Sequence, residues 1–200
     1  MNFSDLMQKI LHRYSLYTCL LVMLVLTTSS CATRPPARYY TLDMSHSAQA
    51  QPAFNFNVER FRVAQALSRD EIMIKTSPTE VEYYATDQWV ANIGELVARK
   101  LQIEMGPRHG ERPELVIMGT IQAFEQLDTP DGTQVQIEID IEVRDSISSR
   151  YVAPLFQHRY RDVRSAENNN PASAVRALSA GLEEIARAIA DDTRHLTVDN

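Results

Sequence analysis

The sequence predicts an α/β fold: a single domain in which a mixed, largely antiparallel sheet of about five to six strands carries two long amphipathic helices. Three observations lead to this class. Residues 88–104 and 171–194 place apolar side chains at the three- and four-residue steps of a helix face. Residues 135–143 alternate apolar and polar side chains, which is typical of a strand with one buried face. Further strand-like runs lie before the first helix and between the two helices, so one sheet can support both.

The first 30 residues have the composition of a bacterial secretory signal. Lys9 and Arg13 precede an apolar run at 16–26, and small hydroxyl residues follow it. The run is shorter than the ~20 apolar residues that a membrane-spanning helix needs. We therefore expect residues 1–30 to be a signal peptide that is removed.

Cys31 follows the small residues directly, at the position of the modified cysteine in bacterial lipoproteins. A diacylglycerol on its thiol and an acylated N-terminus would give the two or more chains that stable anchoring requires. Residues 31–38 would then be a lipidated tether and 39–200 the folded domain. Thr28 stands where Leu is usual, so an unmodified Cys31 after an ordinary signal remains the alternative. Ala32, rather than Asp, follows Cys31 and favours the outer membrane, with the domain facing the periplasm.

The strands are expected from short runs of β-branched and aromatic residues bounded by Gly, Pro, Ser or Asn. A run that is apolar on both faces, at 115–124, is expected to be central in the sheet. In chain order the expected strands are 39–42 after a Pro-containing spacer, 54–63 with a bulge, a hairpin of 71–76 and 80–84, then 115–124, 135–143 and an antiparallel return at 151–161.

The first helix is expected to be capped by Thr86 and Asp87, to begin at Gln88 and to end before Gly106-Pro107. Its apolar stripe includes Trp89, for which a place in the core is the main interpretation and an interface the alternative. The stripe residues are Trp89, Val90, Ile93, Leu96, Val97 and Leu101.

The second helix is expected to begin at Pro171, with Asn170 as its cap. Apolar residues, including Leu182 and Ile185, recur along it in steps of three and four. Packing of this stripe on the sheet is the default, and self-association through it is the alternative.

Motifs for catalysis or metal binding are missing from the sequence. The five histidines, at positions 12, 46, 109, 158 and 195, have no metal-ligand spacing. No Gly-rich phosphate loop, nucleophile elbow or H-E-x-x-H motif occurs. Removal of Cys19 with the signal and lipidation of Cys31 would leave no thiol. We therefore expect no enzyme activity, no cofactor and no metal site, and the net charge of −6 without a basic run argues against nucleic acid.

Two surfaces are candidates for contact with a partner. Glu138, Asp140 and Glu142 alternate along one strand, so their carboxylates line one face about 6.6–6.8 Å apart and could receive a basic partner. A solvated face whose charges deter edge pairing is the alternative. The second candidate is the sheet edge near Tyr39 and Tyr40. A lipid anchor raises the effective concentration of neighbours, so we expect contact with a protein partner or with further copies of the chain.

Three segments occur in the order and spacing of one known family: Cys31 to Leu42, Glu71 to Ser77 followed by 81–84, and Asp87-Gln88-Trp89. They are similar to the ABC-type transport auxiliary lipoproteins, including the paraquat-inducible type associated with MCE-domain lipid transport systems. The resemblance implies a non-catalytic component that faces the periplasm, whose partners are an MCE-domain protein, a permease and an ATPase. A structural envelope lipoprotein without a transport role, or a lipid-anchored enzyme with a scattered site, remain the alternative functions.

Overall fold

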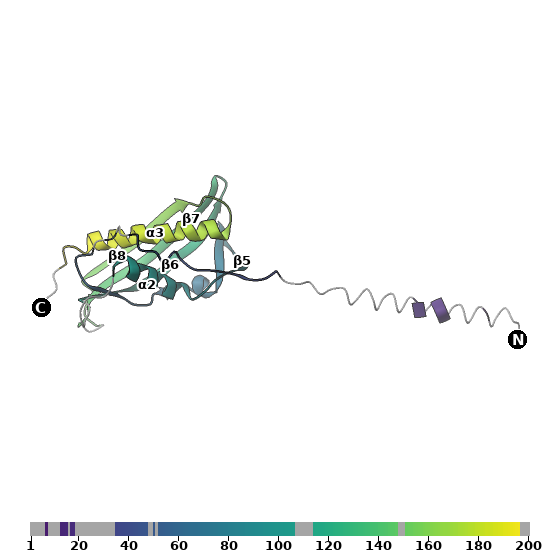
Figure 1. Ribbon diagram of the computed structural model, residues 1–200, viewed down its shortest axis with the longest axis horizontal. Coiled ribbons are helices and arrows are strands. Elements are labelled where there is room, and N and C mark those ends of the chain that lie inside the picture. The colour runs from purple at the N-terminus through teal and green to yellow at the C-terminus, as the bar shows by residue number, and fades with distance from the viewer. Residues whose placement is uncertain are drawn as a thin grey trace. The chain divides into compact units, whose positions relative to one another are not determined.

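The chain forms two separate units, Met1–Pro36 and Ala37–Asn200. The computed structural model describes residues 7, 13–15, 17–18, 35–47, 50, 52–106, 114–147 and 151–196 (Figure 1). Cys31 and most of the expected signal peptide lie outside the described residues, so lipidation stays a prediction. Within the described ranges, no helix is long and apolar enough to cross a membrane.

One mixed sheet forms the centre of the second unit. Its eight strands run in the order β1-β5-β4-β6-β7-β8, with β2 and β3 also paired to β6. The strands are β1 (Arg38–Tyr40), β2 (Phe56–Val58), β3 (Arg62–Val63), β4 (Glu71–Ser77), β5 (Glu80–Trp89), β6 (Leu115–Thr129), β7 (Gly132–Asp145) and β8 (Phe156–Ser165). The predicted α/β class is confirmed. The sheet has eight strands where about five to six were predicted, and one of the additional strands arises because the stretch expected as a single bulged strand contributes two short ones.

The long β6–β7 hairpin lies in the interior of this sheet and forms its longest strand pair. The two strands pair antiparallel from Leu115↔Asp145 to Thr129↔Gly132, with one register shift between Ile121 and Ala123. On its other side β6 pairs parallel with β2, β3 and β4. The apolar run at 115–124 is therefore part of a central strand, as predicted. The final strand begins at Phe156, five residues later than the predicted start of the return.

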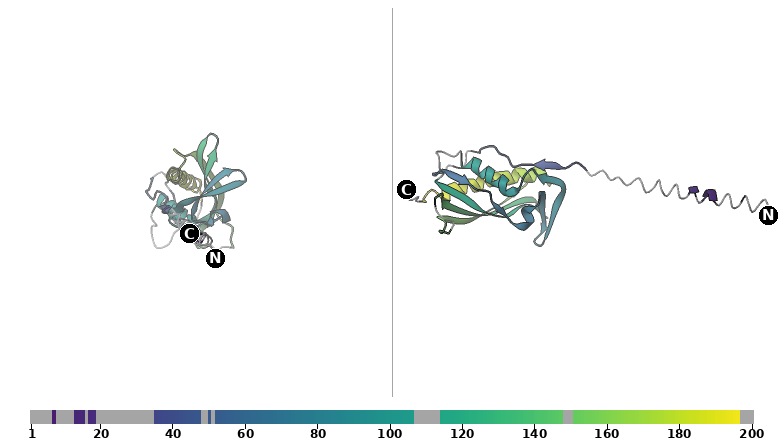
Figure 2. Two further views of the ribbon diagram at one scale, coloured as in Figure 1. Left: turned by 90° about the vertical axis from the view of Figure 1, so that its right-hand side faces the viewer. Right: turned by 90° about the horizontal axis from the view of Figure 1, so that it is seen from below.

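Both helices pack on the same side of the sheet, as Figure 2 shows. Helix α2 (Ile93–Glu104) contacts β2 and β3, and α3 (Pro171–Asp192) contacts β7 and β8. The apolar stripe of α3 is buried, including Leu182 and Ile185. It lies against the buried isoleucines of β7, so the stripe packs on the sheet of its own chain. The opposite face of β7 and β8, on which none of the described helices packs, is here named the open face.

The first helix begins five residues later than predicted. Gln88 and Trp89 belong to β5, and the helix starts at Ile93 after the cap Asn92, whose side chain accepts a 3.0 Å hydrogen bond from the Gly94 N–H. The prediction that the helix begins at Gln88 was wrong because a strand and a helix at this place would both bury Trp89 and Ile93. Periodicity therefore does not distinguish a strand from a helix here. The exposure of Val90 does distinguish them. A helix beginning at Gln88 would place Val90 on its buried stripe, whereas Val90 lies outside the helix and is 59% exposed.

Trp89 lies in the core, as predicted. It is buried, and its ring lies 5.7 Å from the ring of Phe124, measured between centroids. The last helix also begins as predicted, at Pro171, with the Asn170 side chain accepting a 2.9 Å hydrogen bond from the Ser173 N–H. Trp89 therefore packs against the central strand β6, and α3 packs against β7 and β8.

Candidate functional site

The open face carries the acidic row that the sequence predicts. Along β7, Ile137, Ile139 and Ile141 point toward the helices and are buried. The alternating Glu138, Asp140 and Glu142 therefore share the opposite face and are partly exposed. The structure thus places the three carboxylates together.

These carboxylates are already paired with arginines of the same chain. Arg159 on β8 contacts both carboxylate oxygens of Asp140, from Nε at 2.5 Å and from Nη2 at 3.0 Å, and its Nη1 lies 3.2 Å from Glu138. Arg144 pairs with Glu142 at 3.0 Å. The hydrogen bonds from Arg159 hold the pKa of the Asp140 carboxyl below its ordinary value. The row is therefore a set of ion pairs on the protein surface.

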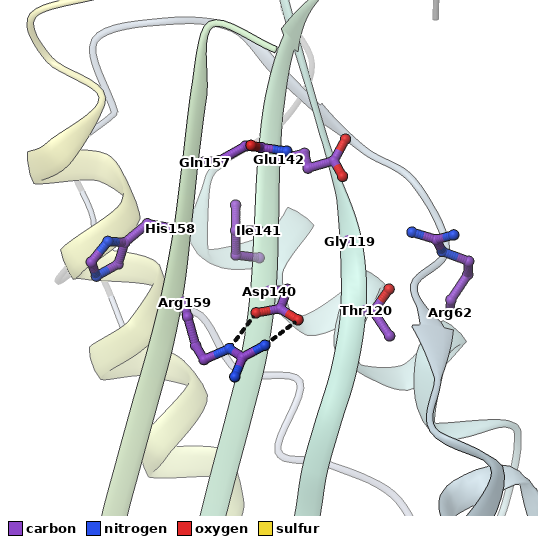
Figure 3. A pocket seen from close by; sticks show the side chains of 9 residues that line it. All are labelled: Arg62, Gly119, Thr120, Asp140, Ile141, Glu142, Gln157, His158 and Arg159. Atoms are coloured by element: carbon purple, nitrogen blue, oxygen red, sulfur yellow. Dashed lines mark hydrogen bonds and ion pairs between the residues drawn. The ribbon is translucent and has the colours of Figure 1, made fainter. Parts of the chain in front are cut away.

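A groove of about 440 Å³ crosses the open face beside these ion pairs (Figure 3). Arg62 of β3 stands at one side and Arg159 at the other, with Thr120 and Asp140 between them. A second hollow, of about 340 Å³, adjoins it and shares Arg62 and other lining residues. Together they form one polar depression across four strands, which we call the cross-sheet groove. Its lining residues are Glu59, Arg60, Arg62, Met118, Gly119, Thr120, Asp140, Ile141, Glu142, Arg144, Gln157, His158 and Arg159.

Gly119 allows the strands beneath this groove to approach closely. A Cβ built on Gly119 would lie 1.9 Å from the backbone oxygen of Asp140 and 3.2 Å from the ring of Phe61. Real Cβ atoms are not found at the first of these distances, so only glycine fits unless β7 moves. The position of Asp140 therefore depends on glycine at position 119.

Tyr39 and Tyr40, the second candidate contact, lie at the other edge of the sheet. Strand β1 pairs parallel with the end of β5, from Arg38↔Asp87 to Tyr40↔Trp89. Tyr39 is 65% exposed, whereas Tyr40 donates a 2.9 Å hydrogen bond to Asp87. The strand order places this edge and β8 at opposite ends of the sheet. The structure therefore does not bring the two candidate surfaces together.

Asp87 is the residue that fixes β1 to the sheet. Its side chain is 3% exposed and accepts hydrogen bonds from Arg38, Tyr40 and Thr86. Burial raises the pKa of the Asp87 carboxyl, but these hydrogen bonds outweigh burial, and the pKa lies below its ordinary value. From the sequence, Asp87 was predicted to cap a helix. Its role in the structure depends on the parallel pairing of β1 with β5, which the sequence pattern does not predict.

A second charged cluster attaches the segment after β1 to the helices. Lys100 of α2 is fully buried, and its Nζ donates to Glu104 at 2.7 Å, to Glu183 of α3 at 2.9 Å and to the backbone oxygen of Ser45 at 2.8 Å. Burial lowers the pKa of Lys100, but the two carboxylates outweigh it and raise the pKa above its ordinary value. Sequence periodicity missed this cluster. The pair at positions 100 and 104 was the available signal, since charges four apart share a helix face.

Glu125 of β6 is a buried carboxyl without an ion-pair partner among the described residues. It is 3% exposed, and one of its oxygens accepts a 2.8 Å hydrogen bond from the Phe124 N–H. Burial raises the pKa of this carboxyl. It lies outside the cross-sheet groove, so nothing connects it to a ligand site.

Metal binding has no cluster of ligands to support it in the described part of the chain. No group of three or more His, Cys, Asp and Glu side chains lies at metal-binding distances there. His109 and Cys31 are outside the described residues. His158 packs edge-on against Tyr160, with ring centroids 4.7 Å apart. What the site offers is a polar surface with fixed guanidinium and carboxylate groups.

The fold and the cross-sheet groove define a single-domain α/β protein with one helix-covered face and one open, polar face. Residues 40–190 match the family model of the ABC-type transport auxiliary lipoprotein component. The chain belongs to this family, which confirms the resemblance drawn from the sequence. No curated protein sequence matches the chain.

Two crystal structures share the fold. One is a protein from Xanthomonas campestris described by the family model DUF330, with a TM-score of 0.64 and 14% sequence identity over 78% of this chain and 94% of that chain. The other is described as an uncharacterized protein, with a TM-score of 0.60 and 15% identity over 79% of this chain and 99% of that chain. At these identities the likeness concerns the fold alone.

Proposed function

We propose that the protein is a lipid-anchored, non-catalytic auxiliary component of an MCE-type ABC transport system for lipids. In this role it bridges or scaffolds the MCE-domain protein and the permease–ATPase complex, and it contributes to the integrity of the envelope. It is held at the outer membrane through Cys31 and faces the periplasm, and it assembles with further copies of itself.

The observation that carries this proposal is the family match. It spans residues 40–190 and therefore nearly the whole folded unit, so the domain itself, and not a peripheral motif, has the features of an ABC-transport auxiliary lipoprotein. Absence of a metal cluster within the described residues is compatible with a component that acts by contact.

The beginning of the folded unit suits a protein held close to a membrane. Six residues lie between Cys31 and Arg38, the first residue of β1, so the two are seven residue steps apart. Such a spacer reaches at most about 25 Å when fully extended. Strand β1 is in turn fixed to the sheet by Asp87. An anchor on Cys31 would therefore keep the domain near the lipid surface.

The anchor is tested by the intact mass of protein extracted from membranes. We expect a chain that lacks residues 1–30 and carries acyl mass on Cys31. Fractionation of the envelope should place it with the outer membrane. A soluble chain with an unmodified Cys31 would refute the anchor, and recovery with the inner membrane would refute the localisation.

The transport role is tested by cross-linking in envelopes and mass spectrometry of the captured proteins. We expect an MCE-domain protein and the subunits of an ABC transporter, and light scattering of the purified lipoprotein should show an assembly larger than a monomer. Capture of none of these proteins, with a monomer in solution, would contradict the proposal and favour a structural envelope lipoprotein.

A further inference from the structure

The charges around the cross-sheet groove leave an excess of unpaired arginines. Glu138, Asp140 and Glu142 pair with two arginines, Arg159 and Arg144, which leaves this part of the surface one negative charge in excess. Among the described residues, by contrast, no ion pair forms at the groove residues Arg60 and Arg62 or at Arg161 of β8, and all three are exposed. Glu59 is the one groove acid that also lacks an ion pair in this part of the chain. With five arginines (60, 62, 144, 159 and 161) against four acids (59, 138, 140 and 142), this surface carries a net charge of +1 in a chain whose net charge is −6.

Arg161 extends this surface to the free edge of the sheet. It lies opposite Glu138 in the β7–β8 register, but Glu138 is paired with Arg159 instead. Strand β8 is the last in the strand order, and its pairing with β7 is continuous over ten residues without a register shift. Its outer edge therefore offers an unbroken row of backbone donors and acceptors.

The spacing of the unpaired arginines suits an extended chain. Arg62 lies on β3 and Arg161 on β8, and three strand spacings of about 4.8 Å place their strands about 14 Å apart. Carboxylates four residues apart on an extended segment are separated by about 13 Å. One segment can therefore reach both guanidinium groups.

The lining of the groove favours a protein segment over a lipid. Apart from Met118, Gly119 and Ile141, every lining residue is polar or charged. An anionic lipid would bring acyl chains that this surface cannot bury. An extended acidic peptide that crosses the strands can use the arginines for its side chains and buries no acyl chain.

We propose that the open face binds an acidic, extended segment of a protein partner, held by Arg62 and Arg161 across the cross-sheet groove. The internal ion pairs of Arg159 and Arg144 reduce the repulsion between the β7 carboxylates and this segment. The inference rests on the proposed function as a component that acts by contact, and it assigns the charge of the partner: acidic, whereas the acidic row taken alone predicts a basic one.

The test is binding of a labelled peptide to the full chain extracted from membranes in detergent. The probe is a peptide of about twelve residues that alternates Glu and Ser, and it spans about 40 Å when extended. A Lys-Ser peptide of equal length and a soluble, short-chain phosphatidylglycerol are the alternative probes. The variants are R62E/R161E and the milder R62A/R161A. The matched control is R176E, because Arg176 is also exposed and lies on α3, on the helix side of the sheet.

We expect the Glu-Ser peptide to bind at low salt and to be released at about 1 M NaCl, where the Debye length is about 3 Å. R62E/R161E should weaken binding by about tenfold or more and R62A/R161A by less, whereas R176E should leave it unchanged. Melting temperatures of R62E/R161E and R62A/R161A should stay close to that of the wild type, since Arg62 and Arg161 form no ion pair in the described structure, and R176E loses only the exposed pair with Glu167.

Equal binding by the wild type and R62E/R161E would overturn the inference, as would preferential binding of the Lys-Ser peptide. Binding of the short-chain phosphatidylglycerol that R62E/R161E abolishes, without binding of the Glu-Ser peptide, would assign the surface to lipid headgroups and would also overturn it. In each case, continued capture of the transporter subunits in envelopes would leave the proposed function standing.

Discussion

Replacement of Asp87 by Asn should detach β1 from the sheet edge. The Asp87 carboxylate uses Oδ1 to accept from Tyr40 at 2.9 Å and from Arg38 at 2.8 Å, and uses Oδ2 to accept from Thr86 and Arg38, both at 3.0 Å. An asparagine keeps one acceptor oxygen and places an amide donor against the other pair of donors. Whichever way the amide is turned, its NH2 group loses one contact with Arg38, and the hydroxyl of Tyr40 or Thr86 on that side must turn from donor to acceptor.

The cost follows from which of these contacts are shielded from water. Arg38 is 63% exposed, so its ion pair contributes little. The hydrogen bonds of Tyr40 and Thr86 meet a side chain that is only 3% exposed, and loss of a buried acceptor costs about 1–3 kcal/mol. We therefore expect D87N to lower the free energy of unfolding by about 1–3 kcal/mol at neutral pH. Y40F should cost less, and Y39F should cost almost nothing because Tyr39 is exposed.

The effect should depend on pH in a defined direction. Because the pKa of Asp87 is lowered in the folded protein, its contribution is fully present above the ordinary carboxyl pKa of about 3.9 and is lost as pH falls through the folded value. The difference between wild type and D87N should therefore shrink under acid.

Urea titrations at neutral and acidic pH measure the global effect, and hydrogen exchange measures the local one. The amide of Val90, which donates to the Tyr40 carbonyl at 2.8 Å, should exchange faster in D87N. Unchanged urea midpoints and unchanged Val90 exchange would refute the view that Asp87 fixes β1.

Two further predictions concern buried side chains. Leu182 is fully buried on α3, so L182A should lower the free energy of unfolding by about 2–5 kcal/mol. A loss below about 0.5 kcal/mol in urea titrations would instead mean that the stripe faces a partner. Burial raises the pKa of Glu125, so this carboxyl should destabilise the fold increasingly as pH rises above its ordinary value of about 4.3. E125Q should therefore raise the melting temperature at neutral pH and not at low pH, and identical melting curves at neutral pH would contradict this.

The elements that the sequence predicts well are those whose periodicity has a single explanation. The strict alternation at 135–143 has no helical counterpart, and the stripe from Val175 to Ile189 is too long for a strand; both are present. The start of the first helix failed because the buried pattern of Trp89, Ile93 and Val97 fits either structure. What decides it is the hydrogen bond from the Trp89 N–H to Asp70 O, at 2.7 Å, which no local pattern contains.

The candidate site was predictable only in part, for a related reason. Positions 138, 140 and 142 share a face by strand geometry alone. Their pairing with Arg159 requires the β7–β8 register, which places Asp140 opposite Arg159, nineteen positions along the chain. Without knowledge of that register, Glu138, Asp140 and Glu142 are interpreted as unpaired negative charges. The register converts it into ion pairs and leaves Arg161 without one.

The attachment of the segment 38–47 at two places has a mechanical consequence. A pull on the chain before Ala37 reaches β1 first. When the pull acts along the strand, the backbone bonds to β5 and the side-chain bonds to Asp87 bear the load together, in shear, and do not break one after another as in peeling. Should β1 slip, the load passes to the Lys100 cluster and so to both helices. The domain can thus resist tension between its N-terminal segment and whatever binds its open face.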